Sequence, residues 1–211
     1  SRGFKKELDQ ILGFLPAVKN KWLFSATLPA GIQEIVTTHL AADAERIKVS
    51  SKNVVNSNIA HQYVMCDDAE KLHVLQLFLK TRKTERGVLF CRTKAAAKLL
   101  AKQLIAKNIA TDAIHGDLLQ KERDKVMRAF KNETLRVLVA TDVAARGIDI
   151  SDLSFVAHYQ LPESEEYYTH RSGRTARAGK EGTSMCFVNP KEIKVLRAYE
   201  RTLNINFKQV R

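Results

Sequence analysis

Short apolar runs alternate with longer amphipathic segments along most of the chain. The short runs are rich in Val, Ile and Leu, which is typical of buried strands, and the longer segments repeat apolar residues at helical spacing. The predicted strands are Trp22 to Phe24, Arg46 to Val49, Gln62 to Met65, Val88 to Cys91, Asp112 to Ile114, Val137 to Ala140, Phe155 to Tyr159 and Ser184 to Val188. The predicted helices are Phe4 to Leu15, Pro29 to His39, Ala69 to Lys83, Lys94 to Lys107, Lys121 to Lys131, Ser164 to Arg171 and Lys191 to Leu203. This order predicts an α/β fold with a doubly wound, mostly parallel sheet and helices on both faces.

A polar stretch rich in Ser and Asn, Ser50 to Asn58, interrupts the alternation. It lies between a predicted strand and the next apolar run, so we place a linker at residues 51–58. Residues 59–211 contain six of the predicted strands, which is enough for a complete α/β domain. Residues 1–50 contain two strands and two helices, which is too little for a doubly wound sheet. We therefore expect residues 1–50 to be the C-terminal fragment of another domain.

The composition is that of a folded and strongly basic protein. Of the 211 residues, 35 are Lys or Arg and 23 are Asp or Glu, which gives a formal net charge of +12. Because 45% of the residues are hydrophobic, the chain can bury a core, and a disordered polycation is excluded. A folded domain with this charge favours nucleic acid as a partner.

Cysteine usage and hydropathy indicate an intracellular protein. The three cysteines, Cys66, Cys91 and Cys186, are far apart and show no Cys-x-x-Cys spacing, so we expect reduced core residues. No apolar stretch approaches the roughly 20 residues that cross a bilayer, and Ser1 to Lys6 lack the apolar run of a signal peptide. We therefore expect a cytoplasmic protein with no membrane partner, and we predict no metal site on this chain.

The densest group of cations is a basic segment punctuated by glycine, His170 to Lys180. Arg171, Arg174 and Arg177 recur at every third residue, so on a helix or tight turn the three guanidinium groups would point in roughly the same direction. Three like charges on one face repel one another unless an anion lies among them, and Arg favours bidentate recognition of phosphate. The alternative is a solvated basic loop, which is what most charge runs are.

Polar or small residues follow three predicted strands at the point where each strand ends. These residues are Arg92 and Thr93, His115 and Gly116, and Thr141, Asp142, Arg146 and Asp149. The carboxyl ends of parallel strands meet at one edge of a sheet, where ligand sites gather. The two acids near Arg146 also fit a structural salt bridge. However, three strands bring polar or small residues to the same edge of the sheet, which favours a ligand site. Ser25-Ala26-Thr27, taken alone, indicates only a helix start with Thr27 as its cap.

Taken together and in order, these strings resemble the DEAD-box family of ATP-dependent RNA helicases, within helicase superfamily two. The matching strings are Ser25 to Thr27 (motif III), Val88 to Lys94 (motif IV), Gln120 to Arg123 (the Gln-x-x-Arg element), Ala140 to Asp149 (motif V) and His170 to Gly179 (motif VI). The resemblance covers nearly the whole chain. It implies that residues 1–50 are the end of a first RecA-like domain and that residues 59–211 are a complete second one. One departure is Ala176, where the family commonly has glycine.

The resemblance implies ATP and Mg²⁺ as cofactors, with ATP bound between the two RecA-like domains. Arg174 and Arg177 are expected to act as arginine fingers, and Gly147 and Asp149 to contact the nucleotide, Asp149 at the ribose hydroxyls. His170 and Arg171 are expected to bind the acidic motif of the first domain and the Ser25-Ala26-Thr27 motif across the cleft. The sequence contains neither a Gly-x-x-x-x-Gly-Lys-Ser/Thr loop nor an Asp-Glu-Ala-Asp string, which the family would place before Ser1. We therefore expect the chain alone to bind no ATP tightly and to hydrolyse none.

RNA is the macromolecular partner that the resemblance implies, held through its backbone with low sequence specificity. The expected RNA-binding residues are Arg92, Thr93, Gly116, Arg123, Thr141 and Arg146. A further expected partner is the missing N-terminal RecA-like domain, and the strand at Trp22 to Phe24, without its parental sheet, suggests self-association through residues 1–50. Two alternatives remain open: a DNA helicase of the same superfamily and, for the isolated chain, a passive RNA-binding module.

Overall fold

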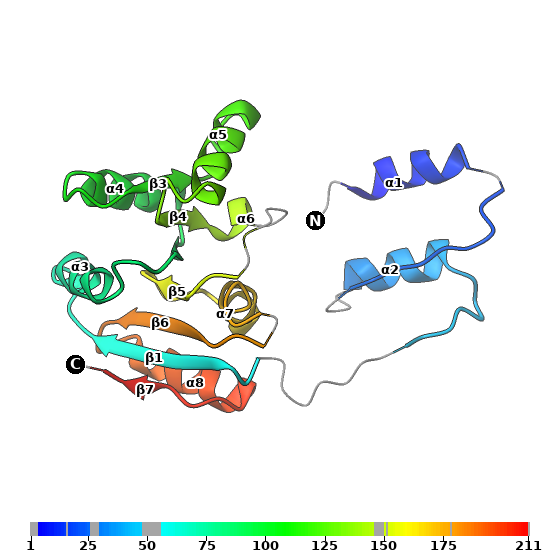
Figure 1. Ribbon diagram of the computed structural model, residues 1–211. Coiled ribbons are helices and arrows are strands. Elements are labelled where there is room, and N and C mark those ends of the chain that lie inside the picture. Colours follow the sequence, from blue (N-terminus) through cyan, green and yellow to red (C-terminus); the bar gives the residue numbers. More distant parts are fainter. Residues whose placement is uncertain are drawn as a thin grey trace. The chain divides into compact units, whose positions relative to one another are not determined.

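The computed structural model describes residues 4–15, 17–25, 30–47, 56–145, 150, 152–177 and 179–210. The chain divides into two compact units, Ser1–Ser50 and Ser51–Arg211 (Figure 1). The first unit contains two helices, α1 (Phe4–Gly13) and α2 (Ala30–His39). Both were expected from the helical spacing of apolar residues, and α1 ends two residues earlier than predicted.

The two strands predicted in the first unit are wrong wherever the structure describes them. Trp22 to Phe24 forms no regular structure, and neither do Arg46 and Ile47; Lys48 and Val49 lie outside the described residues. A strand persists only when a neighbour pairs with its backbone, and the described residues of this unit include no strand. The side chains of Trp22 and Phe24 are consequently 78% and 85% exposed.

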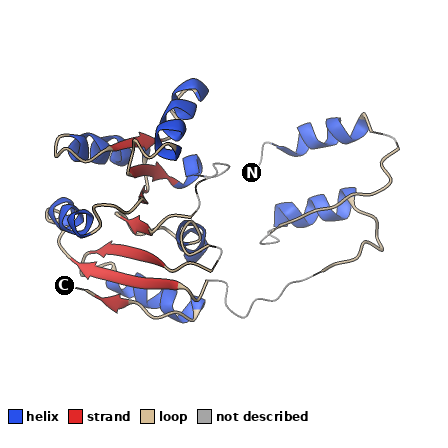
Figure 2. Cartoon of the chain, in the orientation of Figure 1, coloured by secondary structure: helices blue, strands red, loops and turns tan. Residues whose placement is uncertain are grey.

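The second unit is built on a seven-stranded sheet in the order β3-β4-β2-β5-β6-β1-β7, and all neighbouring strands are parallel (Figure 2). The strands are β1 (Ile59–Met65), β2 (Gly87–Cys91), β3 (Thr111–Ile114), β4 (Val137–Thr141), β5 (Phe155–His158), β6 (Gly182–Val188) and β7 (Lys208–Gln209). The six strands predicted after residue 59 are all present. Only the two-residue strand β7, which is too short to show a pattern, was not predicted.

Helices cover both faces of this sheet. They are α3 (Lys71–Thr81), α4 (Lys94–Ile105), α5 (Gln120–Lys131), α6 (Asp142–Ala145), α7 (Glu165–Ser172) and α8 (Ile193–Leu203). In β2, Leu89 packs in the same cluster as α3 and α4, whereas its neighbours Val88 and Phe90 pack with α5 and α6. A third cluster joins the other side of β1 and β6 to α7 and α8. This alternation confirms the doubly wound α/β fold.

Helix α7 begins near the carboxyl ends of the strands and ends near their amino ends. The helix follows the carboxyl end of β5 and runs back toward the amino ends of the strands, where Thr175 bridges to Leu153 just before β5. The residues after α7 therefore lie beside the starts of β1, β5 and β6, while the residues after β2, β3 and β4 lie at the opposite edge. The predicted site residues are thus divided between the carboxyl edge of the sheet, where the C-terminal ends of its strands lie, and the opposite edge, where the N-terminal ends lie.

Candidate functional site

A tight loop, Gly173 to Arg177, follows α7 and is here called the arginine loop. Gly173 ends the helix by donating its backbone N–H to the carbonyl of Thr169 at 2.9 Å. Thr175 is buried and donates its hydroxyl to the carbonyl of Leu153. Ala176, also buried, has a φ of 56°, a left-handed conformation that favours glycine. The loop therefore turns sharply between its two arginines.

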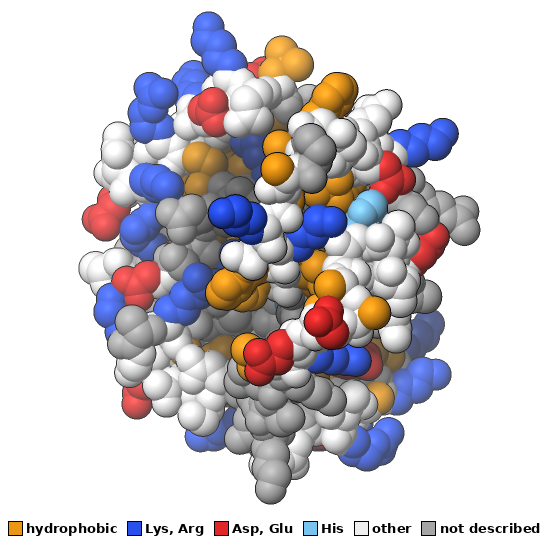
Figure 3. Space-filling model, turned by 90° about the vertical axis from the view of Figure 1, so that its right-hand side faces the viewer, with side chains coloured by type: hydrophobic (Ala, Val, Ile, Leu, Met, Phe, Trp, Pro, Cys, Tyr) orange, Lys and Arg blue, Asp and Glu red, His pale blue; other side chains and the backbone are white. Residues whose placement is uncertain are grey.

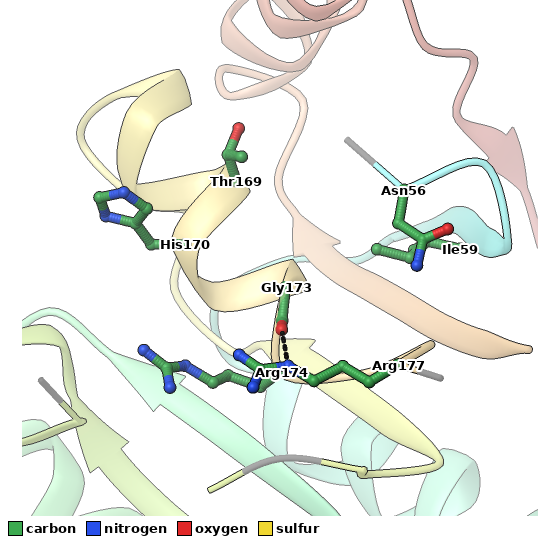
Figure 4. A pocket seen from close by; sticks show the side chains of 7 residues that line it. All are labelled: Asn56, Ile59, Thr169, His170, Gly173, Arg174 and Arg177. Carbon is green, nitrogen blue, oxygen red and sulfur yellow. Dashed lines mark hydrogen bonds between the residues drawn. The ribbon is translucent and has the colours of Figure 1, made fainter. Parts of the chain in front are cut away.

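The arginine loop borders a cavity of about 270 Å³ (Figure 4). The residues that line it are Asn56, Ile59, Thr169, His170, Gly173, Arg174 and Arg177. None of these described lining residues is acidic. Arg177 folds back so that its Nε donates to the carbonyl of Gly173 at 3.0 Å. Two guanidinium groups at a cavity without an acid suit an anionic ligand such as a phosphate group.

Arg174 and Arg177 lie close enough to repel each other. Burial lowers the pKa of Arg174, and the charge of Arg177 lowers it further. Guanidinium groups carry a positive charge in proteins at neutral pH. The uncompensated repulsion favours binding of an anion between them.

Arg171 does not share the direction of the other two arginines. Its side chain is 1% exposed, and its Nε and Nη2 donate to Oδ1 and Oδ2 of Asp142 at 2.6 and 2.7 Å. Its Nη1 donates to the carbonyl of Gln160 at 2.9 Å. The prediction that all three guanidinium groups point the same way is therefore wrong. Residues three positions apart lie on one face only within a helix, and α7 ends at Ser172, before Arg174 and Arg177.

Arg92, Thr93 and Thr141 lie at the carboxyl edge of the sheet, as predicted, but their polar atoms are partly engaged. Arg92 donates from its Nε to the carbonyl of Leu161 at 2.6 Å, and its side chain remains part-exposed. Thr93 caps α4 by accepting from the N–H of Ala96 at 3.1 Å. Thr141 is buried at the end of β4. The side chains best placed to meet a ligand here are therefore those of Arg92 and Thr93.

The loop after β3 adds an open backbone position to this edge. Gly116 is exposed, and no atom lies within 4 Å of where a Cβ would stand, so a ligand can approach its backbone. Asp117, next in sequence, accepts from Lys94 and Lys98 of α4 at 2.6 and 3.0 Å. These two hydrogen bonds hold the pKa of Asp117 at about 2. The structure thus places two lysines at this edge that the sequence reasoning did not single out.

The comparisons with known proteins agree on one family. The family model described as the helicase conserved C-terminal domain matches residues 70–179. The DEAD-box ATP-dependent RNA helicase CshA of Bacillus subtilis is 40% identical over 200 residues, which are 95% of this chain and 40% of the relative. This chain belongs to the DEAD-box helicase family. It spans about 40% of the length of the curated relatives that it matches.

Solved DEAD-box structures show the same fold. A DEAD-box protein from the hyperthermophile Methanococcus jannaschii has a TM-score of 0.70 and is 40% identical, with 100% of this chain and 56% of that chain covered. The Saccharomyces cerevisiae protein Dbp5 bound to RNA and ADP BeF3 has a TM-score of 0.86 at 28% identity, again over 100% of this chain and 56% of that chain. These likenesses confirm the RecA-like fold predicted for the chain.

The DEAD-box motifs that follow motif III occupy two separate places on the second unit. Motif VI supplies Arg174, Arg177 and the exposed His170 at the arginine loop. Motif IV and the Gln-x-x-Arg element lie at the carboxyl edge, where Arg123 donates to the carbonyl of Ala144 and thereby ties α5 to α6. Motif V, which begins at Ala140, brings Thr141 and Asp142 to this same edge at the end of β4. Arg171 connects the two places, because it comes from motif VI and pairs with Asp142 of motif V.

Several predicted residues cannot be compared with the structure. Thr27, Arg146, Gly147 and Asp149 lie outside the described residues, as do residues 51–55 of the predicted linker. Ser25 is described and is exposed in the first unit.

Within the described part of the chain, no group of three or more His, Cys, Asp or Glu residues could hold a metal ion. No helix in these parts of the chain is long and apolar enough to span a membrane.

Proposed function

We propose that this chain is the C-terminal part of an ATP-dependent RNA helicase, which remodels or locally unwinds RNA duplexes. In this proposal residues 1–50 are the end of the first RecA-like domain, residues 51–58 the linker and residues 59–211 the second RecA-like domain. The observation that carries it is the pair Arg174 and Arg177 at a cavity whose described lining includes no acid. The family membership and the 40% identity to CshA support it.

In the proposed mechanism the arginine loop acts on the phosphates of ATP. When bound, ATP with Mg²⁺ supplies the phosphoryl group that is transferred to water; the first RecA-like domain holds both, and the second unit binds neither tightly by itself. Arg174 and Arg177 stabilise the negative charge of the transition state, an effect worth about 10³ to 10⁵ in rate. Asp149 and Gly147 contact the nucleotide, by the resemblance alone.

The remaining motif residues couple the cleft to the rest of the protein. His170, Ser25 and Thr27 are proposed to meet across the cleft, as the resemblance implies. Arg171 has a different role from the one expected, because its guanidinium group is buried in the pair with Asp142. We assign it to holding α7, and so the start of the arginine loop, against motif V.

RNA is proposed to lie along the carboxyl edge of the sheet. Its expected contacts are Arg92, Thr93, Gly116, Arg123, Thr141 and Arg146. The part-exposed guanidinium of Arg92 and the open backbone at Gly116 support this placement. RNA as the partner is supported by the relative Dbp5, which is bound to RNA. Contacts of this kind go to phosphate and sugar, so low sequence specificity follows. The proposal also includes the first RecA-like domain as a partner, self-association through residues 1–50 and a cytoplasmic location.

The test is RNA-stimulated ATP hydrolysis by the whole product of the gene, compared with the 211-residue chain. The whole product is expected to turn over, and Arg174→Ala or Arg177→Ala to lower kcat by about 10³-fold or more with RNA binding kept. Arg197→Ala, which removes a part-exposed pair with Glu200 on α8, is the control. The 211-residue chain alone is expected to show no turnover.

Three results would contradict the proposal. A folded whole product without nucleic-acid-stimulated hydrolysis would overturn it. Stimulation by DNA alone would instead indicate the DNA helicase alternative. Turnover by the 211-residue chain that disappears in Arg174→Ala would overturn the view that this chain holds only part of the ATP site.

A further inference from the structure

The side chain of Asn56 makes a direct contact with the arginine loop. Its Nδ2 donates to the carbonyl of Ala176, the residue that immediately precedes Arg177. Asn56 also lines the cavity that holds Arg174 and Arg177, and it comes from the segment before β1, far from motif VI in sequence (Figure 4). A residue outside the motifs therefore contacts the backbone between the two arginines.

The turn that carries Asn56 is itself fixed to the sheet. The Oδ1 of Asn56 accepts from the N–H of Asn58 at 3.0 Å, which closes a turn at residues 56–58. The carbonyl of Asn58 accepts from the N–H of Gly182 at the start of β6, at 3.1 Å. Because the turn is closed and its Asn58 end is bound to the start of β6, the amide of Asn56 is presented to the arginine loop in one orientation.

Two residues stand between Arg174 and Arg177, and each is anchored to a different strand. Thr175 is bound to Leu153, just before β5. Ala176 is bound to Asn56, just before β1, and has the left-handed φ of 56°. A left-handed conformation of an L-residue persists only where its surroundings determine it. The hydrogen bond from Asn56 supplies that determination on the Arg177 side of the loop.

We propose that Asn56 is a positioning residue that fixes the Ala176 carbonyl and thereby sets the spacing of Arg174 and Arg177 for binding phosphate. This inference rests on the proposed function of the arginine loop and extends it to a residue that no motif includes. Asn56 belongs to the second unit, Ser51–Arg211, as do the two arginines.

Hydrogen exchange in the 211-residue chain tests the contact without any need for catalysis. Asn56→Ala removes both side-chain hydrogen bonds, and Asn56→Asp keeps the acceptor for Asn58 but has no donor for Ala176. Both variants are expected to exchange the amides of residues 173–180 about three- to tenfold faster. Asn58→Ala is the matched control, since the hydrogen bonds of Asn58 are made by its backbone. Wild-type exchange in Asn56→Asp would show that Asn56 only forms its turn and would overturn the proposal.

Kinetics of the whole product test the positioning role. Asn56→Ala is expected to lower the kcat of RNA-stimulated ATP hydrolysis about tenfold while the KM for ATP stays within about twofold, and Asn58→Ala to match the wild type. Asn56→Asp, which also adds a carboxylate beside Arg174 and Arg177, is expected to lower kcat at least as much and to raise the KM. Wild-type kcat in both Asn56 variants would overturn the positioning role and leave the proposed function intact. A wild-type product without RNA-stimulated hydrolysis would overturn the proposed function and the positioning role with it, whatever the exchange rates of the Asn56 variants.

Discussion

The guanidinium group of Arg171 and the carboxylate of Asp142 form a bidentate ion pair, with N···O distances of 2.6 and 2.7 Å. The pair joins α7 to the end of β4, and the plane of the guanidinium lies over Phe90 with 5.1 Å to the ring centroid. Arg171 is almost fully buried, so this charge has no access to water that could replace its partner. The two motifs that bear most of the predicted site residues are thus held together by one interaction.

Removal of Asp142 is expected to destabilise the second unit strongly. Asp142→Ala leaves a buried guanidinium without its carboxylate, which costs about 3 to 5 kcal/mol of unfolding free energy. Lys180→Ala, which removes an exposed pair with Asp152, is expected to cost less than about 1 kcal/mol. Urea unfolding followed by circular dichroism measures both changes. Equal losses in the two variants would refute a special contribution of the buried pair.

Ala176→Gly is expected to leave stability unchanged or raise it by up to about 1 kcal/mol. An L-residue in the left-handed region is strained by roughly 1 to 2 kcal/mol, and glycine removes that strain but adds freedom to the unfolded chain. Ala101→Gly, in the buried interior of α4, is the matched control and is expected to cost at least about 1 kcal/mol. Thermal melts should therefore show Ala176→Gly to be more stable than Ala101→Gly by at least about 1 kcal/mol. A loss at Ala176 as large as that at Ala101 would contradict the argument.

The sheet of the second unit could be predicted because its central strands are buried on both faces and therefore appear in the sequence as apolar runs. In β2 and β4 every residue is buried, and both strands appear in the sequence as continuous apolar runs. The strand at Trp22 to Phe24 failed for the opposite reason. Its apolar run predicts burial, but the described residues of its unit include no strand to pair with it. Local pattern predicts strand formation only where the rest of the sheet is present.

The sequence predicted which residues belong to the candidate site better than it predicted where their side chains point. The spacing of Arg171, Arg174 and Arg177 carries no sign that α7 ends between the first and the second, so the burial of Arg171 could not be foreseen. Asn56 carried no signal at all, because its contact with Ala176 joins residues 120 positions apart. Long-range hydrogen bonds of this kind depend on the register of the sheet, which the sequence pattern does not specify.

Acidification is expected to destabilise the second unit through His61. Burial lowers the pKa of His61 to about 4, while the unfolded chain has the ordinary value of about 6.5. Above pH 6.5 the imidazole is neutral in both states. As the pH falls from 6.5 to 4, only the unfolded state gains the proton, so the unfolding free energy falls by about 1.4 kcal/mol per pH unit.

The comparison of His61→Phe with the wild type isolates this effect. His61 accepts or donates a hydrogen bond with Tyr168 at 2.5 Å, and the loss of that bond shifts stability equally at each pH. The slope between pH 7 and 5, from urea unfolding, is expected to be shallower in His61→Phe. An unchanged slope in His61→Phe would refute the assignment to this residue.

RNA affinity is expected to depend on salt and on Asp117. If about four basic groups contact single-stranded phosphates, log affinity falls with log salt at a slope of about −3. Asp117→Asn releases Lys94 and Lys98 from their pairs, so the affinity should rise several-fold and the slope steepen by about 1. Fluorescence anisotropy with a labelled RNA measures both. A salt-independent affinity would refute backbone contacts, and Asp152→Asn is the control at the other edge of the sheet.

The apolar side chains of the first unit are expected to drive self-association of the 211-residue chain. Trp22 and Phe24 lie with ring centroids 6.2 Å apart, and both are largely exposed. Covering such rings removes apolar surface from water at about 25 cal/mol per Å². The mass from light scattering should therefore rise with concentration, and the emission of Trp22, the single tryptophan, should shift to the blue. Phe24→Ser should weaken both changes, whereas Leu99→Ser, at an exposed position of α4, should not. A monomer at all concentrations with water-exposed Trp22 would refute association through residues 1–50.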